Sequence, residues 1–111
     1  LPISRGILST IYAQLSTEID DTSLQKLYQD TYQDEFFVRL CPSGTLPATQ
    51  YVRGSNFCDL GYCLDKRTGR LIILSAIDNI VKGAAGQAVQ NMNLMNGFEE
   101  TEGLYGAPFF P

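Results

Sequence analysis

Hydrophobic and polar positions along the chain follow two periods, and one of them indicates strands. Four stretches are rich in β-branched, aromatic and other apolar residues, which favour the pleated, half-buried surface of a sheet. They span residues 6–15, 36–40, 56–64 and 70–77. The last two flank a turn that ends at Gly69, so we expect a hairpin there. Residues 70–77 are nearly all apolar, which predicts a central strand covered on both faces.

The other period is that of an α-helix, and it indicates a first helix that begins near Thr22. Thr22 and Gln25 fit a capping box, in which the two side chains satisfy the opening amide groups of a helix. The residues that recur at helical spacing behind this cap are Leu24, Leu27, Tyr28 and Thr31. We expect the helix to run to about Gln33.

A second helix is expected in the segment IDNIVKGAAGQAVQNMNLMNG, residues 77–97. Asp78 or Asn79 can cap its start, and Gly97 is typical of the position just beyond a helix end. The amide groups at the helix start, with the positive end of its dipole, favour an anion or a polar amide. One apolar line is expected to pack on the sheet, formed by Ile80, Ala84, Ala88 and Met92.

Two glycines make this second helix unusual. Gly83 and Gly86 fall on one side of it together with Gln90, and each costs about 1 kcal/mol relative to alanine. A side that carries so few atoms lets another backbone or a flat ligand come close. The alternative is close packing of the helix within its own domain. Lys82 lies in the first turn, where the helix dipole disfavours a positive charge, so a compensating partner is expected.

The order strand, helix, strand, strand, hairpin, helix predicts an α+β fold. We expect a mixed, largely antiparallel sheet with helices packed on one side. Residues 50–53 are compatible with the additional short strand in this order, and residues 98–111 should be irregular.

Composition and charge narrow the classes of function. The chain has 111 residues, which suits a single domain, and a net charge of −4. Its eight basic residues are scattered, whereas nucleic-acid binding needs a positive patch. The longest apolar run, residues 71–74, is too short to cross a membrane. Because the chain does not begin with Met, we expect a part of a longer protein.

The chain contains three cysteines and no histidine. Cys–His and Ser–His nucleophile pairs are therefore excluded, and no CxxC pair is present to begin a zinc site. The odd number of cysteines favours reduced thiols in the cytoplasm. We expect Cys58 and Cys63 to be buried on opposite faces of one strand, and Cys41 to be the most exposed of the three.

Polar candidates for binding lie at two places. Arg5 precedes the first strand, where it could hold a carboxylate or phosphate through two parallel hydrogen bonds, or remain a solvated strand-end charge. Residues 53–56, Arg-Gly-Ser-Asn, read as a turn between strands.

Three segments together resemble the C-terminal part of the N-acetyl-γ-glutamyl-phosphate reductase family. They are RGILSTIYAQL, YVRGSNFCD and SAIDNIVKGAAGQAVQNMNLMNG, in the family's order. The resemblance implies a second domain of the glyceraldehyde-3-phosphate dehydrogenase type, which follows a Rossmann domain in an NADPH-dependent enzyme of arginine biosynthesis. In the family a cysteine attacks the acyl phosphate and a histidine assists. Both belong to segments upstream of this chain, so residues 1–111 hold no catalytic residue and should be inactive alone, with no cofactor bound.

The resemblance also implies roles for single residues. Asn79 resembles the asparagine that contacts the nicotinamide carboxamide, and Gly83 and Gly86 match the part of the helix that faces the Rossmann domain. Arg5 lies just after the segment that lines the acyl-phosphate site, so substrate contact is implied for it, and also for Ser55 and Asn56.

Two other functions remain open on the sequence. One is a reductase that acts on a carrier-protein-bound aminoadipyl phosphate in lysine synthesis. The other is a stand-alone interaction module that kept the domain and lost catalysis. The resemblance implies a homo-oligomer in which the sheet takes part. In isolation, the helix face with Gly83 and Gly86 and the tail with Phe109 and Phe110 should drive self-association.

Overall fold

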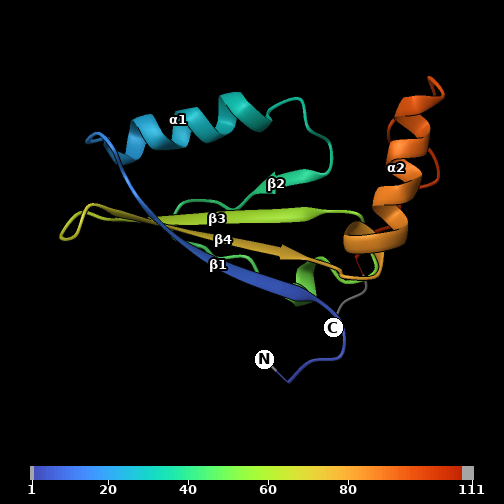
Figure 1. Cartoon of the computed structure of the whole chain (residues 1–111), viewed down its shortest axis with the longest axis horizontal. Helices are drawn as coiled ribbons and strands as arrows, with labels where there is room; N and C mark the ends of the chain where they lie inside the picture. Colours follow the sequence, from blue (N-terminus) through green and yellow to red (C-terminus); the bar gives the residue numbers. More distant parts are fainter. Residues whose placement is uncertain (1, 109–111) are drawn as a thin grey trace.

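The computed structural model describes residues 2–108, and its strands form one mixed sheet in the order β1-β4-β3-β2 (Figure 1). These strands are β1 (Ile7–Gln14), β2 (Val38–Leu40), β3 (Cys58–Asp65) and β4 (Arg70–Ile77). β4 pairs antiparallel with β1 and with β3, and β2 adds a short parallel edge beside β3. The α+β class, the hairpin and the central position of β4 are confirmed.

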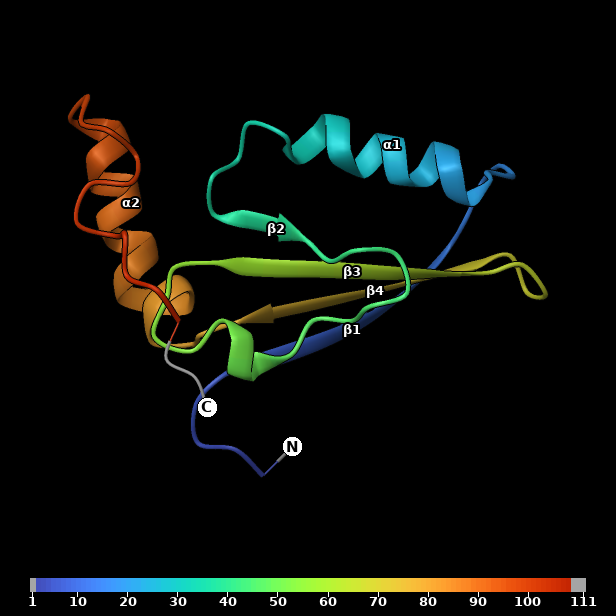
Figure 2. The ribbon, with the colours of Figure 1, turned by 180° about the vertical axis from the view of Figure 1, so that it is seen from behind.

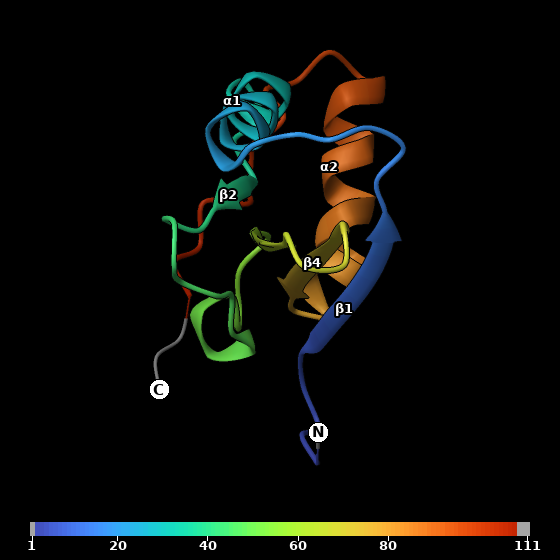
Figure 3. The same cartoon turned by 90° about the vertical axis from the view of Figure 1, so that its left-hand side faces the viewer.

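The two faces of the sheet are covered by different segments. Adjacent residues of a strand point to opposite faces. Tyr62 stacks on Tyr28 of α1 (Asp21–Tyr32), with ring centroids 4.7 Å apart, whereas the neighbouring Gly61 lies against Pro47. Helix α1 therefore covers one face, and the segment of residues 41–55 crosses the other (Figure 3).

Along β1, the edge strand, other segments of the chain cover the two faces of the sheet only in part. Two of its large apolar residues on each face are exposed: Ile7 and Ile11 on one, Leu8 and Tyr12 on the other. In β4 only Leu71 and Ala76 are buried. The expected cover on both faces of β4 is thus not complete within residues 2–108.

Three local expectations were wrong. Helix α1 is capped by Asp20, whose carboxylate accepts from Ser23 N, so the helix begins before the predicted capping box. Residues 50–53 do not form a strand, because a 3₁₀ turn, η1 (Thr49–Tyr51), leads into a tight turn where Gly54 has φ +78°. Cys63 is exposed, while Cys41 and Cys58 are half-buried. Cys63 shares a face with Gly61 but lies nearer the hairpin, beyond the contact with Pro47.

The second helix forms as a π-helical turn, η2 (Val81–Ala85), followed by α2 (Gly86–Met95). Gly97 has φ +71°, and Phe98 N donates to Asn93 O, so the expected stop is confirmed. The helix stands at one end of the sheet rather than lying on a face (Figure 1).

The predicted inner face of this helix was wrong. Ile80 is 51% exposed and Met92 49%, and the two alanines between them are exposed as well. The buried residues of α2 are Gly86, Gln90 and Asn93. Polar contacts decide this orientation, because Gln90 and Asn93 hydrogen-bond to the turn before β3 and to the tail.

The C-terminal segment runs back along α2 (Figure 2). Asn93 Nδ2 donates to the carbonyl oxygens of Glu100 at 3.2 Å and Glu102 at 2.9 Å. Residues 98–108 contain no regular element, as expected. Phe109 and Phe110 lie outside the described residues. No helix of the described part is long and apolar enough to cross a membrane.

Candidate functional site

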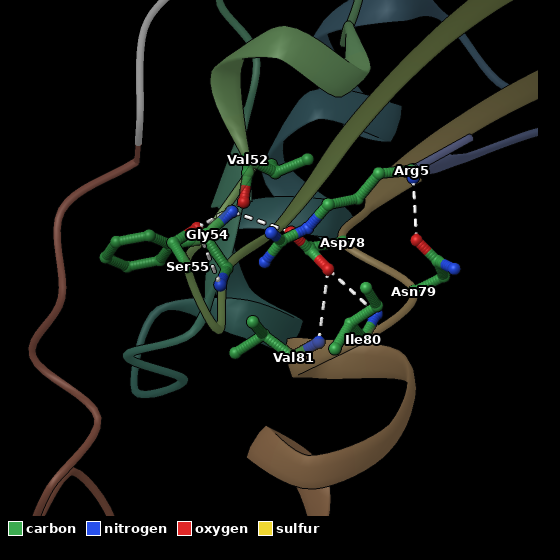
Figure 4. A network of polar contacts seen from close by, with 10 residues as sticks. Arg5, Val52, Gly54, Ser55, Asp78, Asn79, Ile80 and Val81 are labelled. Carbon is green, nitrogen blue, oxygen red and sulfur yellow. Dashed lines mark hydrogen bonds and ion pairs between the residues drawn. The ribbon is translucent and has the colours of Figure 1, made fainter. Parts of the chain in front are cut away.

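The pairing of β1 with β4 brings two of the predicted site residues together. Ile7 lies opposite Ile77, so the same register places Arg5 across from Asn79 just beyond the end of the sheet. Gly6 N donates to Asn79 Oδ1 at 2.7 Å, and Arg5 Nε donates to Asp78 Oδ2 at 2.7 Å (Figure 4). Arg5 and Asn79 thus share one end of the molecule with the start of the second helix.

Asp78 is the centre of this arrangement and is completely buried. Its Oδ1 accepts from the backbone N–H groups of Ile80 at 2.8 Å and Val81 at 3.1 Å. Its Oδ2 accepts from Gly54 N and from Arg5 Nε, both at 2.7 Å. Burial opposes the charged form of this carboxyl, but these hydrogen bonds outweigh burial, and the pKa of Asp78 lies below its ordinary value of 3.8.

The expectation that the start of the second helix is open to an external anion was wrong, because Asp78 binds its first amide groups. A carboxylate of the chain itself occupies the place where an anion was expected, because it binds the first amide groups of the helix. Of the two candidates for the cap, Asp78 fills the role, and Asn79 is left to bond β1. Sequence reasoning noticed Asp78 only as a cap, since its contacts with Arg5 and Gly54 depend on pairing that the pattern does not reveal.

Arg5 is held at one of its three guanidinium nitrogens. Its side chain is 32% exposed, and Nε is the atom that bonds Asp78. Within residues 2–108, Nη1 and Nη2 have no hydrogen-bond partner. Two parallel donors of this kind match the oxygens of a carboxylate or phosphate.

Ser55 and Asn56 lie in the interior rather than at a surface. Both are nearly inaccessible, at 1% and 2% exposed. Ser55 Oγ donates to Val52 O at 2.7 Å, which closes the turn. Asn56 Nδ2 donates to Gln90 Oε1 at 3.0 Å, and Asn56 Oδ1 is buried without a partner in the described part of the chain. Both side chains are thus kept from solvent, although Gly54, the neighbour of Ser55, bonds the same Asp78 oxygen as Arg5.

The two glycines of the second helix have different surroundings. Gly86 is buried, and a Cβ there would collide with Asn56 Oδ1 and come within 2.7 Å of Val81 O. Gly83 is exposed, and a Cβ there would first meet Ile77 Cδ1 at an ordinary 3.4 Å. Gly86 therefore serves packing within the domain, while Gly83 leaves the surface beside Asn79 bare.

Lys82, for which a compensating partner was expected, bonds a neutral side-chain amide. Its Nζ donates to Gln90 Oε1 at 2.7 Å, and Gln90 Nε2 donates in turn to Glu100. Burial lowers the pKa of Lys82, although the nearby carboxylates of Glu100 and Glu35 work in the opposite direction. Gln90 thus joins the helix, the tail and Asn56, and it turns away from the open end of the site.

Chemically, this end of the sheet offers hydrogen-bond donors from Arg5 and Asn79. The Cys58 thiol lies at the same end, opposite Ile77 and 3.4 Å from Ser75 Oγ. No group of three or more Cys, Asp or Glu residues able to hold a metal ion occurs among residues 2–108. Desolvation raises the pKa of Cys41, and the nearby Asp59 carboxylate acts in the same direction. The donors of Arg5 and Asn79 that are unpaired within residues 2–108 have the hydrogen-bonding character that suits an anion and a polar amide.

Residues 1–79 match the family model described as semialdehyde dehydrogenase, dimerisation domain. Proteins named N-acetyl-γ-glutamyl-phosphate reductase are similar over the whole chain, with 66% identity in Desulfotalea psychrophila and 61% in Geobacter metallireducens. The chain covers 32% of the length of each.

Solved structures show the same fold at lower identity. The chain is similar to aspartate semialdehyde dehydrogenase II from Vibrio cholerae, with a TM-score of 0.69 at 20% identity over 87% of this chain and 29% of that one. A second structure of the enzyme from that organism gives a TM-score of 0.66 at 19% identity, over 89% and 30%. Since the family model covers most of its length, the chain belongs to the semialdehyde dehydrogenase dimerisation domain family.

Proposed function

We propose that residues 1–111 are part of the C-terminal domain of an NADPH-dependent N-acetyl-γ-glutamyl-phosphate reductase. The intact enzyme would reduce the acyl phosphate to N-acetylglutamate 5-semialdehyde, with release of phosphate, in the cytoplasm. Identity of 51–66% to proteins of that name along essentially the whole chain carries this proposal. The Rossmann domain and the reactive cysteine and histidine would lie in the remaining two-thirds of such a protein. Residues 1–111 would then contact the substrate and the cofactor but would supply no catalytic group.

Arg5 is the residue that fits the acyl phosphate. Its free Nη1 and Nη2 groups are two parallel donors beside a surface open to solvent, and they match two phosphate oxygens. In the reaction this guanidinium would bind and orient the substrate, and it would balance charge on the phosphate as it departs. Ser55 and Asn56 do not support substrate contact in the same way, because both are buried and engaged within the domain.

Asn79 and Gly83 fit the nicotinamide end of the cofactor. The oxygen of the Asn79 amide is taken by Gly6 N, so its Nδ2 remains to donate to a carboxamide oxygen. The bare surface at Gly83 lets a flat ring or a second domain approach. When bound, the cofactor supplies the hydride, and these residues would orient its amide. Gly86 does not share this role, because it packs against Asn56 inside the domain.

Exposed apolar residues support the proposal that this domain contacts another domain and another subunit. Ile80 and Met92 on the helix are half exposed, as is Ile11 on β1. We propose that the enzyme's own Rossmann domain covers the helix face and that β1 and its sheet contribute to a homo-oligomer. The family description of a dimerisation domain supports the oligomer.

The alternatives differ in measurable ways. A reductase for a carrier-linked aminoadipyl phosphate would share this domain, and an assay of the intact protein with both acyl phosphates separates the two. A stand-alone interaction module would exist as a native chain of this size. Mass spectrometry of the protein isolated from its source decides that point: the enzyme requires a chain about three times longer, as two-domain proteins of this kind are.

The cofactor contact has its own test. Asn79→Ala in the intact protein should weaken NADPH binding by about tenfold, the effect of one lost hydrogen bond of about 1.4 kcal/mol. Asn91→Ala on the exposed side of α2 is the matched control. Unchanged NADPH affinity and rate in the first variant would refute the assignment of Asn79.

A further inference from the structure

The chain contains two arginine–aspartate pairs, and they are built differently. Arg39 meets Asp59 through two parallel bonds, Nε to Oδ1 at 2.6 Å and Nη2 to Oδ2 at 3.0 Å. Its Nη2 also donates to Tyr51 O, and its guanidinium lies over the Phe57 ring. Nε and Nη2 of this arginine are thus engaged inside the domain, in the two-bond geometry of a structural ion pair.

Arg5 pairs with Asp78 through Nε alone, at 2.7 Å. Both Nη groups remain without a partner among residues 2–108. The two arginines are similarly exposed, at 32% and 39% of their side chains, so exposure does not explain the difference. The difference lies in the aspartates: Asp59 gives both oxygens to its arginine, whereas Asp78 gives one oxygen and divides it with Gly54 N.

We propose that Asp78 is a positioning residue for acyl-phosphate recognition, which fixes Arg5 at Nε so that Nη1 and Nη2 face the phosphate of the substrate. This assignment rests on the proposed function. A helix cap needs only Oδ1, which already serves Ile80 N and Val81 N. Oδ2 therefore serves a second purpose: it joins the Arg5 side chain to the turn at Gly54.

The arrangement also connects the two halves of the site. Asp78 is followed directly by Asn79, and β1 holds Arg5 next to Gly6, which bonds the Asn79 side chain. A buried carboxylate that is completely inaccessible cannot move without breaking four hydrogen bonds. Arg5 is thereby held in one orientation before the substrate binds, which reduces the entropy that binding would cost.

A mutant cycle in the intact protein tests the assignment. Asp78→Asn and Arg5→Gln should each raise the KM for the acyl phosphate by about tenfold or more, and by a larger factor than the KM for NADPH. The double variant should be no worse than Arg5→Gln alone, because Asp78 acts through Arg5. Effects that multiply, or an Asp78→Asn effect confined to thermal stability, would overturn the assignment while the reductase activity stood.

A second pair of variants covers the case in which Asp78→Asn does not fold. Arg5→Lys keeps the charge beside Asp78 but loses the two free parallel donors. It should raise the KM for the acyl phosphate about tenfold, whereas Arg39→Lys should leave that KM unchanged. Equal KM values in Arg5→Lys and wild type would overturn the assignment. A wild-type intact protein without acyl-phosphate reductase activity would instead refute the proposed function, and this assignment with it.

Discussion

The two glycines of the second helix give a matched pair of substitutions with opposite expected signs. Gly86→Ala introduces a Cβ that collides with Asn56 Oδ1 and lies 2.7 Å from both Val81 Cγ1 and Val81 O. A side-chain terminus can move aside, but a backbone oxygen within the same helix cannot. Gly83→Ala meets nothing closer than Ile77 Cδ1 at 3.4 Å and Asp78 O at 3.5 Å, which are ordinary contacts.

The magnitudes follow from two opposing terms. Alanine improves helix propensity over glycine by about 1 kcal/mol at either site. At Gly86, overpacking of a buried position costs about 1–3 kcal/mol. Displacement of Asn56 would also break its hydrogen bond to Gln90, worth about 1 kcal/mol. We therefore expect Gly86→Ala to destabilise the chain by about 2 kcal/mol and Gly83→Ala to stabilise it by up to about 1 kcal/mol.

Urea denaturation of both variants and of the wild type measures these differences in the free energy of unfolding. In thermal unfolding, each kcal/mol should move the midpoint by roughly 4–8 °C. If Gly86→Ala were as stable as Gly83→Ala, the close approach of Asn56 to the helix would be refuted. The intact protein adds a second reading. There, Gly83→Ala should weaken NADPH binding despite its gain in stability, because Gly83 leaves the surface beside Asn79 bare.

Three further predictions concern contacts that hold the domain together. Asn93→Ala removes two hydrogen bonds to the tail, so it should lower the free energy of unfolding by about 1–3 kcal/mol and speed proteolysis of residues 98–108. The control Asn91→Ala, at an exposed position, should change that free energy by no more than about 0.5 kcal/mol. Gly61→Ala places a Cβ 2.7 Å from the side chain of Pro47, so unfolding in urea should show a loss of about 1–3 kcal/mol; a neutral result would contradict the packing of residues 41–55 on the sheet. The pKa of Asp78 is below 3.8 in the folded chain, so the stability it adds is complete above that pH and is lost as the pH falls through the lower folded value. Acid titration should therefore show the gap between wild type and Asp78→Asn closing in that window, and a gap that stays constant into stronger acid would contradict the ionised state of Asp78.

Local signals in the sequence predicted most of the elements. The apolar runs located β1, β3 and β4, although Asp65 at the end of β3 was expected to lie in the turn. Gly69 and Gly97 marked a turn and a helix end where φ is positive. The strand expected at residues 50–53 failed because Val52 is buried in a turn and not in a ladder. Apolar residues in a short segment do not distinguish these two states.

The orientation of the second helix could not be read from its pattern. Hydrophobic periodicity predicted an inner face of Ile80, Ala84, Ala88 and Met92, yet that face is exposed. The face turned inward carries Gln90 and Asn93, whose partners are remote in sequence or in an irregular tail. An exposed apolar face on a helix of this kind indicates surface that another domain or subunit covers.

The candidate site was predicted in part. The resemblance selected Arg5 and Asn79, and the register of β1 against β4 places both at one end of the sheet. The bond from Arg5 to Asp78 was not visible, because the pairing of strands that are far apart in sequence is set by tertiary packing. The resemblance also selected Ser55 and Asn56 as substrate contacts. Side-chain burial, which the sequence did not show, places them in the interior.

The most direct test of the account is the rate of NADPH oxidation by the purified intact protein, with N-acetyl-γ-glutamyl phosphate and carrier-linked aminoadipyl phosphate as separate substrates. The account predicts oxidation with N-acetyl-γ-glutamyl phosphate and at least a tenfold lower kcat/KM in the Arg5→Gln variant, equivalent to about 1.4 kcal/mol of transition-state binding. Oxidation only with the aminoadipyl substrate, or a rate that does not depend on Arg5, would contradict it.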